Sequence, residues 1–441
     1  MFSKKVLVLI CFLGCTQLFA QNKIPSIHEV AQKFYNTYSV QELSYPAVDF
    51  EKRKLGWTVT TKKIVNNNLV NDKSYSFYNV KDAVYFQLPL AAKEDDNVVD
   101  YKLYIDDYKI NGYQLHLFYG YTGWYKDVIN ELSSKSNLSD SALYSLARAY
   151  STYASSLLGN QSGDAIEEEI FNLPLNNNCL INEQLSLYNS IEQKSIQTFK
   201  QLKNQNEQFV TTVGPIAVKY ANETIVQFHA LLTYANKAAV SFELPNNLYS
   251  DSVIQETKKI LAACPTNAIL FSFGDNDFYP VLYVQHKLGF RKDVYLINES
   301  LLGLDRYIFT ATQPQFDCKG IKISVDTNFY KGNKNDYLSM ELNDSTIPFS
   351  KVIQLIKSSK DNELEALKIP ANYFKIKYKE HGLKVQFNVP FLLKNNWVLL
   401  DILNNLNGRK FCISNSFYDS FKGLNKYFTE VENTGLRILQ N

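Results

Sequence analysis

Two carboxylates separated by one residue follow a short apolar run in the second half of the chain. Asp275 and Asp277 stand in the sequence Gly-Asp-Asn-Asp, directly after the run 268–273. Carboxylate oxygens are the ligands that hard divalent cations prefer, and a spacing of two can turn both side chains the same way. Asn276 adds an amide between them. The pattern predicts a ligand site at these three residues, with a divalent cation as the possible cofactor.

The residues around this pair predict a parallel βαβ unit over 268–308. A buried strand, the Gly-Asp-Asn-Asp turn, a helix of about three turns and a second buried strand follow one another. Ligands of a parallel α/β sheet bind at the carboxyl ends of its strands. We therefore expect Asn298 and Glu299, which end the second strand, on the same side. Arg306 is a further candidate ligand, although it can instead pair with Asp305.

The same turn also has a purely structural interpretation. Gly274 permits the turn, Asn276 or Asp277 can cap the helix, and an acidic residue suits the positive helix end. Strands that end in Asp-x-Asp are found in nucleotide-sugar transferases, but this sequence has no Gly-rich phosphate loop. Its five histidines show no paired metal spacing, and no Gly-x-Ser-x-Gly motif is present. Whether the chain is an enzyme stays open at this point.

The first twenty residues have the order of a secretory signal. Lys4 and Lys5 precede an apolar run, and Ala20 stands before Gln21. We expect removal of residues 1–20 and export to the periplasm or cell surface of a diderm bacterium. The alternative is cleavage before Cys15 and a lipid anchor there. No later run is apolar for long enough to cross a bilayer, so an integral membrane protein is not predicted.

Charge and composition narrow the class of partner. The 46 Lys and Arg residues nearly balance the 44 Asp and Glu residues, which argues against nucleic acid. The aromatic content of 14% suits stacking on sugars or peptides, although a coding bias explains it more simply. Four cysteines follow the predicted signal: Cys179, Cys264, Cys318 and Cys412. An oxidising compartment permits disulfides among them, in three possible complete pairings. They can equally be buried free thiols.

Hydrophobic periodicity divides the mature chain into three predicted domains, of overall class α+β / α/β. Residues 21–135 predict a small α+β domain, with a helix over 26–38 and a small antiparallel sheet from Trp57 onward. Residues 136–264 carry helical stripes that favour a helical bundle over peptide-binding tetratricopeptide hairpins. Residues 265–441 predict a Rossmann-like α/β domain that contains a strand at 321–325, an antiparallel hairpin over 374–387 and a terminal helix.

The stretch 274–308, GDNDFYPVLYVQHKLGFRKDVYLINESLLGLDRYI, resembles a known module. It is similar to the soluble tail of large multi-pass envelope proteins of unknown function that look like protein O-mannosyltransferases. A strand, Gly-Asp-Asn-Asp, an aromatic-Pro pair and Asn-x-Ser-Leu-Leu carry the resemblance, which continues to 399–403 and 408–411. Lys410 stands where that family usually has Pro. The resemblance covers residues 262–415 and implies an envelope location and a shared α/β module, without the membrane catalytic portion.

These patterns favour an exported envelope protein that acts as a non-catalytic binding or accessory module. Its expected partner is a glycan, a peptide or another envelope protein. The alternative is a metal-dependent enzyme that acts on envelope glycans with Asp275 and Asp277 at the strand end.

Overall fold

The computed structural model describes most of the chain after the predicted signal. The signal itself, with Cys15, lies outside the described residues. The chain divides into two compact units, residues 1–153 with 163–165 and residues 154–162 with 166–441. The domain boundaries predicted at residues 135 and 264 stay a prediction. The described residues are 24–39, 48–53, 55–65, 68–93, 123–158, 179–211, 213–330, 336–358, 367–378, 382–387, 389–414 and 424–440.

The first unit combines a helix with an antiparallel sheet, as predicted. α1 (Ile27–Thr37) begins after Ser26, whose hydroxyl and the carboxylate of Glu29 form a capping box. The buried face of α1 packs against Trp57 and Phe77 of the sheet. The sheet has the order β1-β2-β3-β4, made by β1 (Val48–Arg53), β2 (Gly56–Val65), β3 (Asn68–Asn79) and β4 (Val84–Tyr85). Two helices follow along the chain, α3 (Trp124–Leu132) and α4 (Asp140–Leu157).

The second unit contains a mixed sheet with five strands among the residues described. Its order is β16-β17-β15-β7-β8. β7 pairs in parallel with both β8 and β15, so the predicted βαβ unit over 268–308 is confirmed. All residues of these three strands are buried, as is typical of strands that are covered on both faces. The strands are β7 (Ile269–Ser272), β8 (Tyr295–Asn298), β15 (Phe411–Ser414), β16 (Phe428–Val431) and β17 (Leu436–Leu439).

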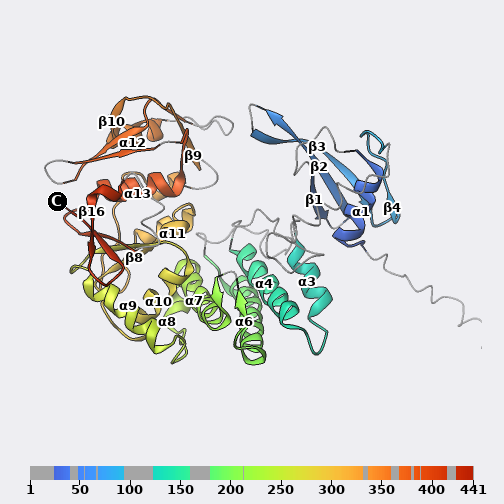
Figure 1. Ribbon diagram of the computed structural model, residues 1–441, viewed down its shortest axis with the longest axis horizontal. Helices are drawn as coiled ribbons and strands as arrows, with labels where there is room; N and C mark the ends of the chain where they lie inside the picture. Colours follow the sequence, from blue (N-terminus) through green and yellow to red (C-terminus); the bar gives the residue numbers. More distant parts are fainter. Residues whose placement is uncertain are drawn as a thin grey trace, which may run out of the picture. The chain divides into compact units, whose positions relative to one another are not determined.

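Helices pack beside this sheet and bring distant parts of the sequence together. α10 (Asp275–Lys287) connects β7 to β8 and contacts both α7 and α9, and α7 also contacts α6. Figure 1 shows α6, α7 and α10 side by side. The other helices of this region are α6 (Asn182–Gln205), α7 (Ile216–Tyr234), α8 (Asn236–Val240), α9 (Asp251–Ala263) and α11 (Asp305–Ala311). A short hairpin, β5 (Val210–Thr211) and β6 (Gly214–Pro215), precedes α7.

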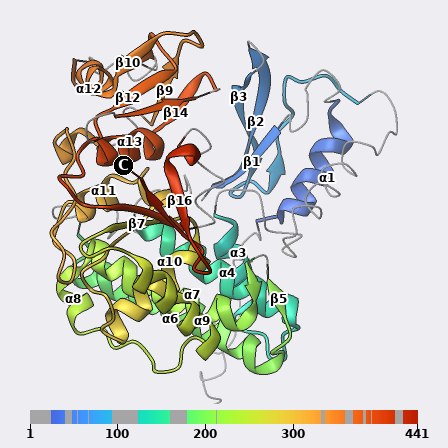
Figure 2. The same ribbon diagram turned by 60° about the vertical axis from the view of Figure 1, so that its left-hand side comes forward.

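Two smaller sheets and α12 lie over α13 (Lys394–Asn404), as both views show (Figures 1 and 2). The predicted hairpin is confirmed, because β12 and β13 pair antiparallel with Phe374 opposite Val385. The sheets have the orders β10-β12-β13 and β11-β9-β14. Their elements are β9 (Tyr337–Met340), β10 (Thr346–Pro348), α12 (Phe349–Ser358), β11 (Lys368–Ile369), β12 (Tyr373–Ile376), β13 (Leu383–Gln386) and β14 (Phe391–Leu393).

Two predicted elements are wrong. Residues 321–325 are no strand, because the Ile321 amide donates to Ala311 O and the Ser324 amide donates to the Asp401 carboxylate. The end of the chain forms the hairpin β16–β17 in place of a helix, and the turn between these strands holds Asn433 and Gly435 at positive φ. The α+β class is confirmed, whereas the Rossmann-like interpretation of the C-terminal layer stays a prediction.

Two further observations concern membrane spans and the cysteines. No helix in the described part of the chain combines the length and the hydropathy that a membrane span needs. Cys264, Cys318 and Cys412 are buried free thiols, and Cys179 is half-buried.

Candidate functional site at the start of α10

The turn after β7 places Asp275 and Asp277 in the first turn of α10. Gly274 precedes the helix at φ 77°, in the left-handed region that favours glycine. The N-cap position is Gly274 itself, and no side chain forms a capping hydrogen bond. The prediction that Asn276 or Asp277 caps the helix is therefore wrong. Both carboxylates still stand where the helix dipole favours negative charge.

The helical backbone also separates the two carboxylates. Residues two apart in an α-helix lie about 200° apart around its axis and do not face each other. The premise that a spacing of two turns Asp275 and Asp277 the same way therefore does not hold within α10. Among the residues that the structure describes, no group of three His, Cys, Asp or Glu side chains is arranged to hold a metal ion. The cation site at the two aspartates stays a prediction.

Asn276 fastens α10 to its neighbours with both ends of its amide. Its Nδ2 donates to Val213 O at 2.8 Å, and its Oδ1 accepts from Asn222 Nδ2 of α7 at 2.8 Å. The hydroxyl of Tyr249 donates to Asn222 Oδ1 at 2.7 Å and extends the chain of hydrogen bonds into the core. These contacts fix the position of the first turn of α10.

The carboxyl of Asp275 interacts electrostatically with a buried ion pair on α7. Glu223 accepts hydrogen bonds from Lys219 Nζ at 2.6 Å and from Ser195 Oγ of α6 at 2.9 Å. Asp275 is half-buried, and this burial raises the pKa of its carboxyl, while Lys219 opposes and Glu223 adds to the rise. Asp275, Glu223 and Lys219 therefore form a mixed cluster of two acids and one base at the start of α10.

A third carboxyl extends this cluster inside the helical layer. Glu192 of α6 is 1% exposed, and its Oε1 has no hydrogen-bond partner among the described residues. The hydroxyl of Tyr188, one helical turn earlier, also has no hydrogen-bond partner among the described residues. Burial raises the pKa of Glu192 well above its usual range; Glu223 adds to the rise and Lys219 opposes it. Burial therefore shifts the equilibrium of Glu192 toward its neutral form.

The sequence analysis missed every member of this cluster except Asp275 and Asn276. A signal was present, because Glu192 and Ser195 interrupt the apolar stripe of α6 at positions that the helical period places in the core. A charged residue within such a stripe indicates either a buried network or a site. The partners on α7, Lys219 and Glu223, could not be assigned from α6 alone.

The remaining predicted residues have other partners. Asn298 ends β8, and its Oδ1 accepts from Ser300 N at 3.1 Å, which caps the short 3-10 helix η1 (Glu299–Leu301). Glu299 is 2% exposed, and its Oε1 accepts from Asn395 Nδ2 at 2.7 Å and from Asn396 Nδ2 at 3.3 Å. Burial raises the pKa of Glu299 to about 7, against the opposing hydrogen bond from Asn396. Glu299 thus bonds to α13, whereas the α10 residues bond to α7.

Arg306 contacts the far end of α7. Its Nε donates to Thr233 O at 2.7 Å, and its Nη2 lies 3.2 Å from Cys179 Sγ. The carboxylate of Asp305 accepts the backbone amide of Arg306 at 2.7 Å. Thr233 and Asn222 lie about 16 Å apart along α7, so Arg306 does not join Asn276 in one site. The structure therefore brings together Asp275 and Asn276, and places Glu299 and Arg306 with different partners.

The solvent face of this region carries an aromatic ring. Phe273, the residue between β7 and Gly274, is 41% exposed. Asn276 is exposed and Asp275 is half-buried beside it in the sequence. The carboxyl end of β7 therefore presents a ring, a carboxyl and an amide within four residues.

Comparison with known proteins identifies one similar region. Residues 254–378 match the family model of TMEM260-associated domain 2. The match runs from α9 to β12 and includes the β7–α10–β8 unit with all predicted site residues from Asp275 to Arg306. It supports a TMEM260-like module in this part of the chain. No curated protein and no solved structure matches the sequence.

Proposed function

We propose that this is an exported protein of the cell envelope that binds a glycan without catalysis at the carboxyl end of β7. The observation that carries the proposal is that Phe273, which is 41% exposed, stands two residues before half-buried Asp275 at the carboxyl end of β7. An aromatic face packs against the apolar face of a sugar, and a few fixed polar groups orient its hydroxyls. The resemblance to envelope proteins that look like O-mannosyltransferases supports a sugar over a peptide or a protein partner.

The site is suited to binding because its polar groups are already held in place. Asn276 is fixed by Val213 and Asn222, and the charges of the Lys219–Glu223 pair act on Asp275. Groups that are ordered before the ligand arrives cost less conformational entropy on binding.

Two features favour binding over hydrolysis. Most glycosidases use two carboxyl groups that flank the scissile bond. Glu192 and Glu223 are each 1% exposed and are closed to a sugar, and Asp275 and Asp277 diverge around the helix. The surface therefore offers Asp275 as a hydrogen-bonding group, while Glu223, the acid whose charge acts on Asp275, is closed to a sugar.

A glycan array with the mature protein tests the proposal. We expect Phe273→Ala and Asp275→Asn each to weaken binding of the captured glycan by at least about tenfold, which is about 1.4 kcal/mol. Asp251→Asn is the matched control, because Asp251 also opens a helix but is exposed on α9. Asp275→Asn should not lower the melting temperature, since the carboxyl that it removes is partly desolvated. An array without a bound glycan, or equal binding by both variants and the wild type, would contradict the proposal.

The metal-dependent enzyme is the alternative, and the same proteins test it. Thermal shifts with Mg²⁺, Ca²⁺ and Mn²⁺ should leave the wild type unchanged if Asp275 serves only to bind a sugar. A stabilisation by one cation that disappears in both Asp275→Asn and Asp277→Asn would favour the enzyme instead.

A further inference from the structure

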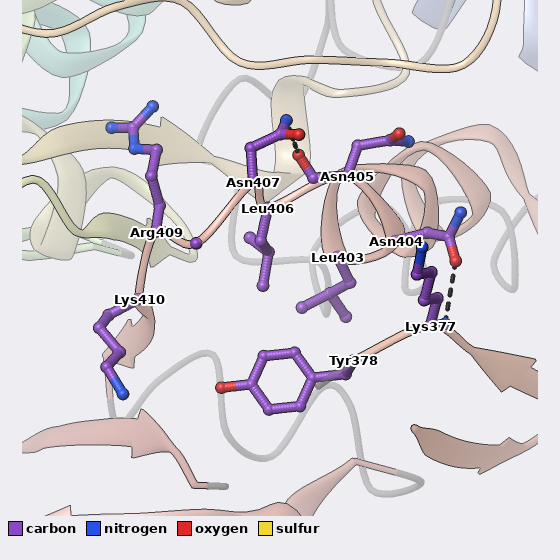
Figure 3. Close-up of a pocket in the computed structure, with 10 residues that line it drawn as sticks. Lys377, Tyr378, Leu403, Asn404, Asn405, Leu406, Asn407, Arg409 and Lys410 are labelled. Carbon is purple, nitrogen blue, oxygen red and sulfur yellow. Dashed lines mark hydrogen bonds between the residues drawn. The ribbon is translucent and has the colours of Figure 1, made fainter. Parts of the chain in front are cut away.

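A pocket of about 510 Å³ lies at the opposite edge of the sheet from Asp275. It is formed at the amino end of β15, where the chain leaves α13, and by the residues that follow β12 (Figure 3). Because β15 and β7 are parallel, this edge is remote from the carboxyl end of β7. The lining residues are Lys377, Tyr378, Leu403, Asn404, Asn405, Leu406, Asn407, Gly408, Arg409 and Lys410.

The floor of the pocket is apolar and aromatic. Leu403 and Leu406 project from the end of α13 toward the ring of Tyr378 (Figure 3). All three side chains belong to buried residues, and the Tyr378 hydroxyl donates to Leu439 O at 3.4 Å, which helps to hold the ring. Tyr378 and Leu406 keep 8% and 6% of their surface exposed, and a flat apolar face of a ligand can cover this remaining surface.

The polar rim carries positive charge. Lys377 and Lys410 lie at opposite ends of the pocket, and Arg409 extends away from Tyr378 (Figure 3). Arg409 donates to three uncharged carbonyls, those of Asn267, Ala268 and Lys319, so these bonds do not neutralise it. None of the described lining residues is acidic.

Asn404 adds a donor at the rim. Its Oδ1 accepts a hydrogen bond from the Lys377 backbone amide at 3.0 Å, so the oxygen of the side-chain amide already has a partner within the protein. Its Nδ2 is then directed elsewhere as a donor. The nearby acid Asp401 is fully buried and accepts hydrogen bonds from Ser324 and Asn405, which place it behind the pocket wall. The rim therefore offers donors and cations to an acceptor ligand.

We propose that this pocket is a second binding site, which takes a small ring-bearing carboxylate. The ring covers the exposed parts of Tyr378 and Leu406, and the carboxylate accepts from a lysine ammonium at the rim. Ammonium–carboxylate hydrogen bonds are stronger than those between neutral groups, so the charge of the ligand decides its affinity. Both sugar acids and aromatic acids have this chemistry. The site is independent of the glycan surface at Phe273 and Asp275.

Calorimetric titrations of the mature protein test this inference. The probes are glucuronate against glucose and benzoate against benzyl alcohol, each an acid with an uncharged partner. We expect at least one acid to bind about tenfold or more tightly than its partner, and to weaken as salt rises from low to high concentration. Stronger binding of glucuronate identifies a sugar acid, and stronger binding of benzoate identifies an aromatic acid.

Substitutions locate the binding. The double variant Lys377→Gln, Lys410→Gln should lose about tenfold or more in affinity for the acid. Lys375→Gln, an exposed lysine on β12 outside the pocket, should leave it unchanged. Phe273→Ala should also leave it unchanged, which separates this site from the proposed glycan site. Equal affinity for acid and uncharged partner, retention of binding in the double variant, or equally tight binding of inorganic phosphate would overturn the inference.

Discussion

Replacement of Glu299 by glutamine should remove a titration that lowers stability as the pH rises. The carboxyl is 2% exposed and accepts hydrogen bonds only from uncharged amides, those of Asn395 and Asn396, among its described contacts. Its pKa is raised from 4.5 to about 7 because burial penalises the charged form. Glutamine keeps an acceptor oxygen for both asparagines and carries no proton that titrates.

The size and the sign of the effect follow from the two pKa values. Between pH 4.5 and pH 7 the unfolded chain loses the Glu299 proton while the folded protein keeps it, so the free energy of unfolding falls with rising pH. The gap between the two pKa values corresponds to about 3 kcal/mol, which is fully lost above pH 7. Relative to the wild type, Glu299→Gln should therefore gain about 3 kcal/mol between pH 4.5 and pH 8.

Thermal unfolding of both proteins at half-unit steps of pH measures this difference. A gain of about 3 kcal/mol corresponds to about 6 °C in the melting temperature of a unit of this size. Glu207→Gln, at an exposed position in the turn after α6, should follow the wild type at every pH. Parallel curves for Glu299→Gln and the wild type from pH 4.5 to pH 8 would refute the buried, titrating carboxyl.

Three further predictions concern other buried or linking groups. Burial lowers the pKa of His229 to about 4, so NMR should find its ring neutral at pH 6, and His229→Gln should remove a loss of stability as the pH falls from 6.5 to 4. Asn276→Ala removes the two hydrogen bonds that tie α10 to its neighbours and should cost about 2 kcal/mol in urea unfolding. A thiol reagent on the native protein should label half-buried Cys179 before Cys264, because the contact with Cys412 and burial raise the pKa of the Cys264 thiol. Peptide mass spectrometry can follow the labelling of each cysteine.

Each of these predictions has a contrary outcome. A titration midpoint of His229 near 6.5 would place its ring in water. For Asn276, the exposed loop residue Asn246 supplies the control, and an equal effect of Asn246→Ala would remove the role of the two hydrogen bonds. Equal rates of labelling at Cys179 and Cys264 would show that the α9–β15 contact is open to solvent.

Local sequence patterns were sufficient where an element is specified by its own residues. The helical stripes within 136–264, the βαβ unit at 268–308 and the hairpin at 374–387 follow from period and turn chemistry, and the structure has helices such as α4, the βαβ unit and the hairpin there. The terminal hairpin is not predicted by period, because its strands are four residues each and too short to show one; only Asn433 and Gly435 in its turn give a local signal.

The sequence by itself determined that Asp275, Asn276 and Asp277 follow a buried strand, because apolar runs, glycine and polar residues state this locally. It could not determine their partners. Only the tertiary structure decided that Asn276 binds Asn222, that Lys219 and Glu223 act electrostatically on Asp275, and that Glu299 bonds to α13. The physical reason is that side-chain direction within a strand or helix is fixed by the backbone, whereas the surface opposite is supplied by a segment many residues away.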